Sequence, residues 1–479
     1  MEHLDVLVVG AGLSGIAAGH YLKTKCAKKT FAIFEAREAI GGTWDLFRYP
    51  GIRSDSDMYT LGYRFRPWRG GKAIADGPSI LEYIRETARD EGLEPHIRFN
   101  HRVVSAAWSS KDARWTVKVT TPKGEETFTA SFMIMCSGYY DYDGGYTPDL
   151  PGIERFKGRV VHPQKWTDDI AYEGKRVVVI GSGATAVTLV PELAKKAEHV
   201  VMLQRSPTYI VSLPAVDPVA NFLTKRMSVE RAYDVTRWKN VILSMAMYNL
   251  SRRFPDRMKR LFVGGVKKSL GKEYDVKKHF TPSYGPWDQR LCLVPDGDLF
   301  DAIKAGRAEV VTDHIETFTE RGIRTKSGHE LEADLVVTAT GLRVSLLGKT
   351  GISVDGETID VAKTLTYKGT MFSDVPNLFI ALGYTNASWT LKCDLTCEWV
   401  CRIINVMDKR GQRVITARRR GDVHETPIID FSSGYIQRAK DKLPKQGPKA
   451  PWRLYQNYLL DLIALRYGRI DDDVVELHG

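Results

Sequence analysis

The first forty residues of the chain contain two short, mostly apolar runs on either side of a glycine motif and a helical stretch. An apolar run at residues 4–9 leads into Gly10-Ala11-Gly12-Leu13-Ser14-Gly15, and a helical stretch continues from there to about Lys25. A second apolar run at 31–34 ends at Glu35. Short, continuously apolar runs on either side of a glycine turn and a helix predict a strand–turn–helix–strand unit of a parallel sheet.

The same order of elements returns near the middle of the chain. Residues 176–180 precede Gly181-Ser182-Gly183-Ala184-Thr185-Ala186, a helix is predicted through Leu193, and the apolar run 200–203 is followed by Gln204-Arg205-Ser206. In both units the glycine motif lies between a buried-strand pattern and a helix, which is the context that indicates dinucleotide binding. The glycines let the backbone approach a pyrophosphate, which rests on the N-terminus of the helix.

The two units differ at the end of their second strand. Glu35 can accept hydrogen bonds from the hydroxyls of an adenosine ribose, so the first unit suits FAD or NAD. The second unit has no acid at this place. Arg205 and the hydroxyl of Ser206 would instead accommodate a 2′-phosphate, so the second unit suits NADP.

Each unit is predicted to receive one more strand from later in the chain. Residues 132–138 (FMIMCSG) and 335–341 (LVVTATG) are apolar runs that end in a hydroxyl residue and a glycine, as expected where a strand passes beneath a nucleotide. Short alternating runs between 103 and 134 predict an antiparallel meander. The segment 143–151 (DGGYTPDLP) is typical of a linker.

These patterns predict an α/β protein with two Rossmann-like dinucleotide-binding domains, one for FAD and one for NADP, and a helical insertion in the NADP domain. The expected boundaries are 1–142 and 368–479 for a discontinuous FAD-binding domain, 147–213 and 280–367 for the NADP-binding domain, and 214–279 for the helical insertion.

Length and composition agree with two or three folded domains. The chain has 479 residues, of which 43% are hydrophobic and 27% charged. No apolar run approaches the roughly 20 residues that span a bilayer, and no basic segment of a secretory signal precedes the first apolar run. We therefore expect a cytoplasmic protein. The six cysteines are too few for a disulfide framework, and their spacing predicts no metal site.

The net charge of +11 is concentrated in residues 251–279, which hold ten Lys or Arg and three Asp or Glu. Such a cluster can contact phosphates or an anionic membrane. A solvated helical face near an entrance for anionic cofactors is the simpler interpretation. The chain lacks the patterns of the common nucleic-acid-binding modules, so we expect no nucleic-acid partner. Peripheral membrane contact through 251–279 stays open.

Residues 156–166 (FKGRVVHPQKW) fit the pattern FxGxxxHxxxW. Together with the two dinucleotide units, this segment resembles the Baeyer–Villiger branch of the class B flavoprotein monooxygenases, whose N- and S-oxygenating relatives carry Tyr or Phe in place of Trp166. In that branch Pro or Asp directly follows the tryptophan, whereas here Thr167 intervenes before Asp168. The resemblance covers nearly the whole chain and extends to residues 41–68, 179–194, 286–295 and 383–392.

The resemblance implies FAD in the first domain, NADPH on the second and molecular oxygen as co-substrate. It also implies a C4a-peroxyflavin that inserts oxygen into small-molecule ketones, giving esters or lactones, and that oxidises sulfides and thioamides. The residues expected to bind the two cofactors are Gly10, Gly12, Ser14, Gly15, Glu35, Thr43, Trp44, Asp55, Val103, Gly181, Ser182, Gly183, Thr185, Arg205 and Ser206.

By position, Arg290 in the segment PWDQR matches the family's active-site arginine, and Asp55 in RYPGIRSD matches the acid beside the flavin that contacts it. A guanidinium is permanently charged and weakly hydrated, so it can stabilise negative charge without giving up a proton. The family often has Lys before this arginine to help hold the 2′-phosphate. Gln289 stands here, so recognition of the phosphate would depend more on Arg205 and Ser206.

Other interpretations stay open from the sequence. Arg290 could belong to an ordinary surface ion pair, and residues 54–57 could only cap the helix that follows them. The chain could be a heteroatom (N or S) monooxygenase or an NADPH oxidase without ketone activity. It could also be a flavoprotein that acts as a binding module through its basic segment. Trp166 favours the Baeyer–Villiger branch.

Overall fold

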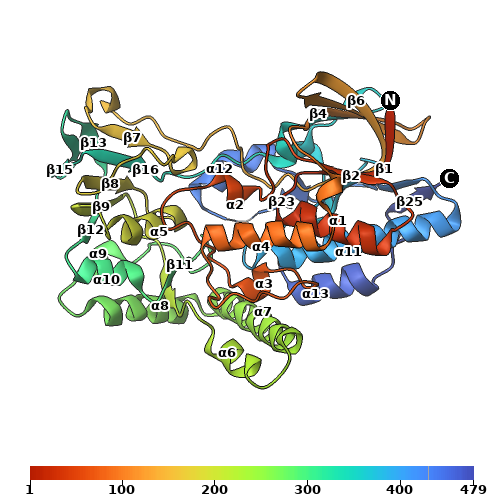
Figure 1. The fold of residues 1–479 in the computed structure, drawn as a ribbon. Coiled ribbons are helices and arrows are strands. Elements are labelled where there is room, and N and C mark those ends of the chain that lie inside the picture. The colour runs from red at the N-terminus through yellow and green to blue at the C-terminus, as the bar shows by residue number, and fades with distance from the viewer. Residues whose placement is uncertain (430) are drawn as a thin grey trace.

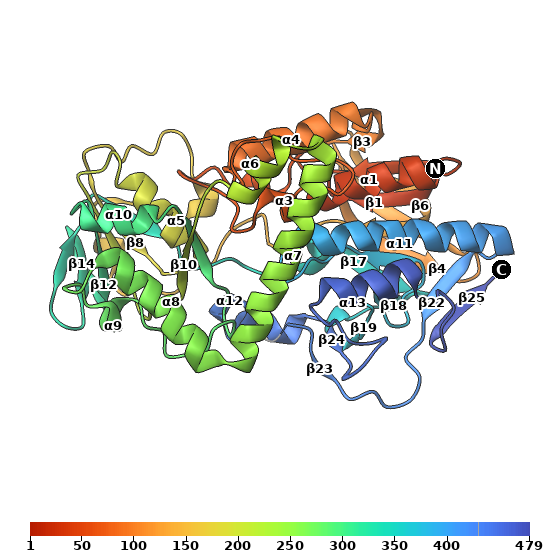
Figure 2. The ribbon, with the colours of Figure 1, turned by 90° about the horizontal axis from the view of Figure 1, so that it is seen from below.

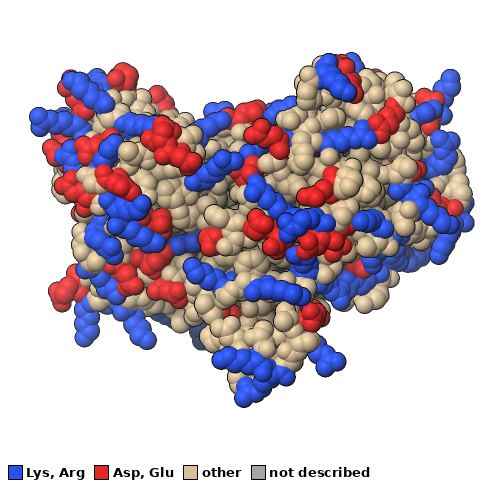
Figure 3. All heavy atoms as spheres, viewed as in Figure 1, with Lys and Arg blue, Asp and Glu red and all other residues tan. Residues whose placement is uncertain are grey.

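The computed structural model describes residues 1–429 and 431–479, and it has two lobes (Figure 1). Both chain termini lie on the same lobe, beside the strands of the first glycine unit. The space-filling view in Figure 3 shows a hollow between the two lobes, with charged side chains of both signs scattered over the visible face.

The first lobe is built on an eleven-stranded sheet in the order β18-β17-β4-β5-β6-β1-β2-β3, with β21 also pairing with β6 and leading on to β20 and β19. Its strands are β1 (Glu2–Val9), β2 (Phe31–Phe34), β3 (Ile97–Arg98), β4 (Arg102–Ser109), β5 (Arg114–Thr121), β6 (Gly124–Met135), β17 (Gly351–Val354), β18 (Glu357–Thr358), β19 (Thr366–Tyr367), β20 (Met371–Phe372) and β21 (Leu378–Ile380).

The predicted first unit is confirmed. β1 pairs in parallel with β2 on one side and with β6 on the other, so Val9 lies opposite both Phe34 and Met135. The strand is apolar without alternation because helices α1 (Leu13–Lys25) and α11 (Trp389–Arg410) cover one face and the β4–β6 meander covers the other. The first half of β6 is antiparallel to β5, as the predicted meander requires.

The second lobe contains the second unit in a five-stranded parallel sheet of order β12-β9-β8-β16-β7. Its strands are β7 (Arg159–Val161), β8 (Arg176–Ile180), β9 (His199–Gln204), β12 (Ala308–Thr312) and β16 (Leu335–Thr338). The predicted late strand is β16, which pairs with β8 in parallel. Gln204 is the last residue of β9, and its side-chain amide donates to the Thr312 hydroxyl at 2.8 Å and the His279 carbonyl at 2.7 Å.

Smaller elements complete the two lobes. The remaining strands form one three-stranded and three two-stranded sheets: β13 (Ile315–Phe318), β14 (Gly322–Thr325) and β15 (Glu330–Glu332); β10 (Ile210–Leu213) with β11 (Cys292–Pro295); β22 (Val414–Ala417) with β25 (Val475–His478); and β23 (Thr426–Pro427) with β24 (Lys445–Gln446). The other helices are α2 (Thr43–Leu46), α3 (Met58–Leu61), α4 (Gly77–Asp90), α5 (Ala184–Leu193), α10 (Asp298–Lys304), α12 (Gly434–Ala439) and α13 (Tyr458–Leu462). Among the described residues, none of the helices has the length and apolar character needed to cross a bilayer.

The helical insertion lies between β10 and β11 and bridges the two lobes (Figure 2). It consists of α6 (Pro218–Thr224), α7 (Val229–Arg253), α8 (Pro255–Leu270) and α9 (Val276–His279). Its second half packs into the core of the second lobe through Val266 and Val276. Its first half packs against the other lobe, because Tyr233 and Val241 are buried in the core of the first lobe.

Arg237 fixes α7 to the first lobe. Its side chain is 4% exposed, and one guanidinium nitrogen donates to the carbonyl oxygens of Tyr59 and Gly62, both at 2.8 Å. A second nitrogen lies 3.6 Å from a carboxylate oxygen of Asp394 on α11. Burial raises the pKa of Asp394 to about 6, although Arg237 opposes the rise.

We predict that Arg237→Leu lowers the free energy of unfolding by about 3–5 kcal/mol at pH 8, because it leaves two carbonyls buried without partners and a buried carboxylate, which keeps only the N–H of Arg64 as a donor, without its counter-charge. Asp394 binds its proton more tightly folded than unfolded, so its contribution to stability decreases as pH rises from about 3.8 to about 6. The loss should therefore be smaller at pH 5, where Asp394 is mostly neutral. Urea unfolding at both values measures it.

Arg231→Leu is the matched control, since Arg231 lies on the same helix with its side chain exposed. Equal losses for the two variants, or the same loss for Arg237→Leu at pH 5 and pH 8, would contradict the assigned role of Arg237.

Candidate active site

The first glycine turn lets the backbone of β1 and α1 touch the end of β6. Gly10 has φ of +103°, and a Cβ atom there would lie 2.6 Å from the carbonyl oxygen of Cys136. A Cβ atom at Gly15 would lie 1.8 Å from the carbonyl oxygen of Gly10. Gly12 occupies the N-cap position of α1 without a side-chain cap. The first N–H groups of α1 are thus available to an anion such as a pyrophosphate.

Glu35 lies buried at the end of β2. One of its carboxylate oxygens accepts from the N–H of Ala11 at 2.7 Å and the other from the N–H of Arg37 at 2.9 Å. Burial raises the pKa of Glu35, and these two N–H groups counteract the rise. Each oxygen keeps lone pairs for a further donor. The carboxylate is therefore held in place with lone pairs free for donors such as the two hydroxyls of a ribose.

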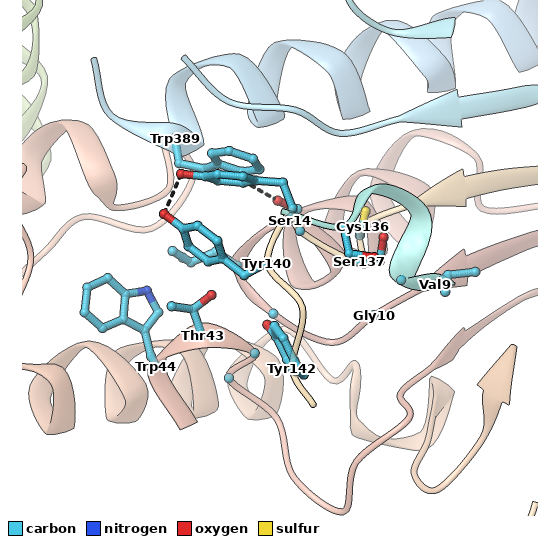
Figure 4. A pocket seen from close by; sticks show the side chains of 18 of the residues that line it. Val9, Gly10, Ser14, Thr43, Trp44, Cys136, Ser137, Tyr140, Tyr142 and Trp389 are labelled. Carbon is cyan, nitrogen blue, oxygen red and sulfur yellow. Dashed lines mark hydrogen bonds between the residues drawn. The ribbon is translucent and has the colours of Figure 1, made fainter. Parts of the chain in front are cut away.

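A cavity runs past this turn and gathers most of the residues predicted for the first cofactor (Figure 4). The predicted residues that line it are Gly10, Gly12, Ser14, Glu35, Thr43, Trp44, Asp55, Val103 and Arg290. Gly15 does not line the cavity; it lies behind the turn, where only a hydrogen atom fits. The lining, the uncapped helix end and the Glu35 carboxylate together fit an adenine dinucleotide such as FAD.

Aromatic side chains that the sequence analysis missed also line this cavity. Tyr139 stacks on Trp389, with ring centroids 5.1 Å apart, and its hydroxyl lies 2.5 Å from that of Tyr140. Burial raises the pKa of both tyrosines, so their phenols stay neutral. The available signal was the run Tyr139-Tyr140-Asp141-Tyr142, which directly follows the predicted strand end at Gly138.

The N-terminus of α11 reaches the cavity through Trp389. The Trp389 indole N–H donates to the Ser14 hydroxyl at 2.9 Å. Ser388 occupies the N-cap position, but its hydroxyl lies 2.6 Å from that of Thr60 and does not cap the helix. The positive end of α11 thus remains available beside the cavity.

Arg290 and Asp55 meet at the cavity as a two-point ion pair. The Arg290 Nε and one terminal nitrogen lie 2.8 and 3.0 Å from the two carboxylate oxygens of Asp55. Both side chains are about one-third exposed. Burial acts to lower the pKa of Arg290, but the Asp55 carboxylate and nearby tyrosines outweigh it and raise the pKa. Asp57, not Asp55, caps α3 by accepting from Thr60 N–H at 3.1 Å.

The second glycine turn repeats the geometry of the first. Gly181 has φ of +134°, and a Cβ atom there would lie 2.4 Å from the carbonyl oxygen of Ala339. Gly183 occupies the N-cap position of α5 without a side-chain cap, and Thr185 lies in the first turn of that helix. The Ser182 hydroxyl donates to the carbonyl oxygen of Ser206 at 3.0 Å.

Arg205 and Ser206 therefore lie next to the second turn, as predicted for a 2′-phosphate site. Both are exposed. Arg205 forms no ion pair with any residue that the structure describes. An exposed cation beside an uncapped helix N-terminus suits a phosphate, but these residues line neither of the cavities found near Arg290.

His162 of the FxGxxxHxxxW segment contacts the two chain segments that connect the lobes, one at Gly145 and the other at Gly341. Its Nε2 lies 3.1 Å from the carbonyl oxygen of Gly341, and its Nδ1 accepts from the N–H of Gln164 at 3.2 Å. These partners require a neutral ring protonated on Nε2, and burial lowers the pKa of His162 accordingly. Gly145 touches the ring so closely that a Cβ atom there would lie 1.9 Å from Cε1.

Comparison with known proteins agrees with this geometry. A family described as flavin-binding monooxygenase-like matches residues 74–405, and an NAD(P)-binding Rossmann-like domain matches residues 8–71. The chain is 54% identical over 474 residues to the FAD-containing monooxygenase EthA of Mycobacterium tuberculosis (strain CDC 1551 / Oshkosh), covering 98% of this chain and 97% of EthA.

Two solved structures share the fold over their whole length. A steroid monooxygenase in its oxidised form bound to NADP is 24% identical with a TM-score of 0.77, and each chain is covered completely. An open form of cyclohexanone monooxygenase is 22% identical with the same TM-score and the same coverage. At this identity the two structures establish the fold alone.

The family match covers more than half of the chain, and the similarity to EthA extends over nearly all of it. The predicted class of flavin monooxygenase is confirmed, which favours an enzyme over a flavoprotein that only binds a partner. The chain belongs to the flavin-binding monooxygenase-like family.

Proposed function

We propose that the chain is a Baeyer–Villiger monooxygenase that uses FAD, NADPH and molecular oxygen to oxidise ketones and sulfur-containing compounds. The observation that carries this proposal is the Arg290–Asp55 pair at the wall of the cavity that fits FAD. Bound flavin would supply the transfer of two electrons from NADPH to oxygen. The chain's own residues would hold the reactants, exclude water and stabilise charge.

The first lobe would hold FAD. Glu35 would accept from the ribose hydroxyls, and the turn at Gly10 and Gly12 would bring the pyrophosphate to the N-terminus of α1. Ser14, Thr43, Trp44 and Val103 line the same cavity and would complete the contacts. We assign residues 1–142 and 368–479 to this FAD-binding domain, as the sequence predicts.

The second lobe would bind NADPH. The turn at Gly181 and Gly183, with Ser182 and Thr185, would hold the pyrophosphate, and Arg205 with Ser206 would contact the 2′-phosphate. We assign 147–213 and 280–367 to the NADP-binding domain and 214–279 to the insertion.

Arg290 would act by charge. Its guanidinium stays protonated at every relevant pH, so it can stabilise negative charge that develops on oxygen in the cavity without giving up its own proton. Asp55 uses both carboxylate oxygens on Arg290, and we assign it the task of orienting the guanidinium. We thus propose a catalytic role for Arg290 and a positioning role for Asp55.

A second, smaller cavity supports an apolar organic substrate. It shares Arg290, Tyr139 and Trp389 with the first cavity, and its remaining walls are mostly aliphatic and aromatic. They include Leu382, Ile428, Phe431, Leu443 and Leu454. Arg290 is its one charged lining residue among those that the structure describes. A ketone or thioether without charge would leave no buried ion unpaired there.

We predict that Arg290→Ala keeps its FAD and is still reduced by NADPH, but that its oxygenated product falls about 100-fold or more while hydrogen peroxide rises. The holoenzyme is mixed with NADPH and oxygen in the presence of a cyclic ketone or, separately, a thioether, and both products are quantified. Arg252→Ala is the control, since Arg252 pairs with Asp288 at 2.7 Å in the same region.

Ester or lactone formation by the wild type supports the Baeyer–Villiger activity. Sulfoxide without ester would instead assign a heteroatom monooxygenase, and peroxide alone with either acceptor would overturn the proposed function. Normal turnover by Arg290→Ala would refute the role of the guanidinium.

We predict that Arg205→Ala raises the KM for NADPH about 10- to 100-fold, because a contact between a charged side chain and the phosphate is lost. The KM for NADH, which has no 2′-phosphate, should stay nearly unchanged. Steady-state flavin reduction with each coenzyme measures both constants. Arg324→Ala in β14 serves as control for an exposed arginine. Equal effects on the two coenzymes would disprove the phosphate contact.

We predict that Gly145→Ala destabilises the protein by about 1–3 kcal/mol, because its Cβ atom would displace the His162 ring from Gly341. Reduction by NADPH should slow about tenfold or more, since the lobes lose their mutual placement. Unfolding midpoints and rapid-mixing rates are the measurements. Gly144→Ala is a close control, as its Cβ atom would contact nothing within 4 Å. Indistinguishable variants would contradict the coupling role of His162.

A further inference from the structure

Helix α7 exposes an apolar stripe along its outer side. Val235, Trp238, Ile242 and Leu250 are spaced so that they share one face of the helix. Ile242 is 58% exposed and Trp238 is 41% exposed. The opposite face carries Tyr233 and Arg237, which are buried against the first lobe. The stripe is therefore a second apolar face, and among the described residues its members remain 41–58% exposed.

Helix α13 lies beside α7 and continues the apolar surface, as Figures 1 and 2 both show. The ring of Trp238 lies 5.8 Å from that of Tyr458, the first residue of α13. Leu459 follows in α13, and Ile463 and Tyr467 lie in the π-helical turn (Ile463–Tyr467) that continues α13; these two are 59% and 70% exposed. We call the two stripes together the α7–α13 patch.

Basic residues flank the patch. Arg231 lies one turn before the stripe on α7, and Arg252 and Arg253 end that helix. Arg252 and Arg253 belong to the basic segment 251–279, which contains ten Lys or Arg and three Asp or Glu. Figure 3 shows blue side chains around a tan surface at the lower projection of the molecule, where α6 and α7 lie in Figure 1.

The charge distribution decides between two occupants of the patch. In a symmetric dimer the same surface meets itself, so the basic segment of one copy would face that of the other or lie near it. Like charges at such distances repel. An anionic lipid surface attracts the same residues, and it accepts single apolar side chains that project from a helix lying parallel to it. Tryptophan and tyrosine are also favoured at that interface.

We propose that the α7–α13 patch docks this enzyme on an anionic lipid surface. Helices α7 and α13 lie flat on the lipid, with the apolar stripes in the boundary between headgroups and acyl chains and the arginines on the lipid phosphates. Gln456, which lines the smaller cavity, lies two residues before α13. Docking therefore brings the apolar cavity close to the lipid, where an apolar substrate concentrates.

The test is sedimentation of the FAD-loaded, full-length protein with lipid vesicles. We expect binding to vesicles of phosphatidylcholine with phosphatidylglycerol, and at least about tenfold weaker binding to phosphatidylcholine alone. Raising NaCl from about 0.05 M to about 0.5 M should weaken binding, because salt screens the attraction between the arginines and the lipid phosphates. Some binding should remain, because salt does not remove the contribution of the apolar side chains. No binding to the anionic vesicles at low salt overturns the proposal. Binding is measured without turnover, so its result is independent of the proposed reaction.

Variants distinguish vesicle binding through the α7–α13 patch from unspecific adhesion to lipid. Ile242→Glu with Ile463→Glu should weaken vesicle binding about tenfold or more, because each places a carboxylate in the lipid boundary. Arg253→Glu with Arg257→Glu should remove the dependence on anionic lipid. Val104→Glu is the control, since Val104 is 45% exposed on β4, far from α7 in Figure 1.

Two results would contradict the proposal even if the wild type binds. One is equal binding by the Ile242→Glu, Ile463→Glu protein and the Val104→Glu protein, with flavin content unchanged in both. The other is a dimer of the wild type in sedimentation velocity that Ile242→Glu converts to a monomer, because a second copy would then occupy the patch.

Discussion

The ion pair between Arg290 and Asp55 joins the two lobes at the point where the larger and the smaller cavity share lining residues. Asp55 lies in the loop before α3 of the first lobe, and Arg290 lies two residues before β11 of the second. Both carboxylate oxygens are engaged, at 2.8 and 3.0 Å. An ion pair that is one-third exposed contributes on the order of 1 kcal/mol to stability at most. Its importance is geometric, because any rotation of one lobe against the other moves the guanidinium relative to the cavity.

Hydrogen bonds and ion pairs join the two chain segments that connect the lobes, around Asp141 and around Arg343, and they help to maintain this geometry. The N–H of Asp141 donates to the Arg343 carbonyl, and the N–H of Ser345 donates to the Tyr139 carbonyl, both at 2.9 Å. Lys349 forms ion pairs with Asp141 and Asp143, at 2.9 and 2.5 Å. The ring of His162 also contacts the second of these segments, at the carbonyl oxygen of Gly341. Because these contacts hold the two connecting segments together, a change in the orientation of the lobes would bend both segments as one unit.

The sequence predicted those parts of the fold that local patterns determine. The run 4–9 is apolar at nearly every position because β1 is covered on both faces, and the glycines after it are needed by the close contact with Cys136. Tyr233 and Ile242 on α7 show what local patterns cannot predict. Both are apolar residues of one helix, yet one is buried and the other is 58% exposed, and only tertiary packing distinguishes them. Asp55 and Arg290 are likewise 235 residues apart, so a family motif rather than a local pattern brought them together.

The N-terminus of α11 is positioned from three directions, and this explains why distant segments bear on one site. Ser388 is held by Thr60 of the first lobe, and Trp389 is held by Ser14 of the glycine turn. The C-terminal tail supplies the third contact, because Gln456 accepts hydrogen bonds from Thr385 and Asn386, each at 2.9 Å. Asn457 then caps α13. Gln456, two residues before α13, therefore links that helix to the loop that positions Trp389. The segment that ends in α13 on the surface thus also forms part of the support of the cavity wall at Trp389.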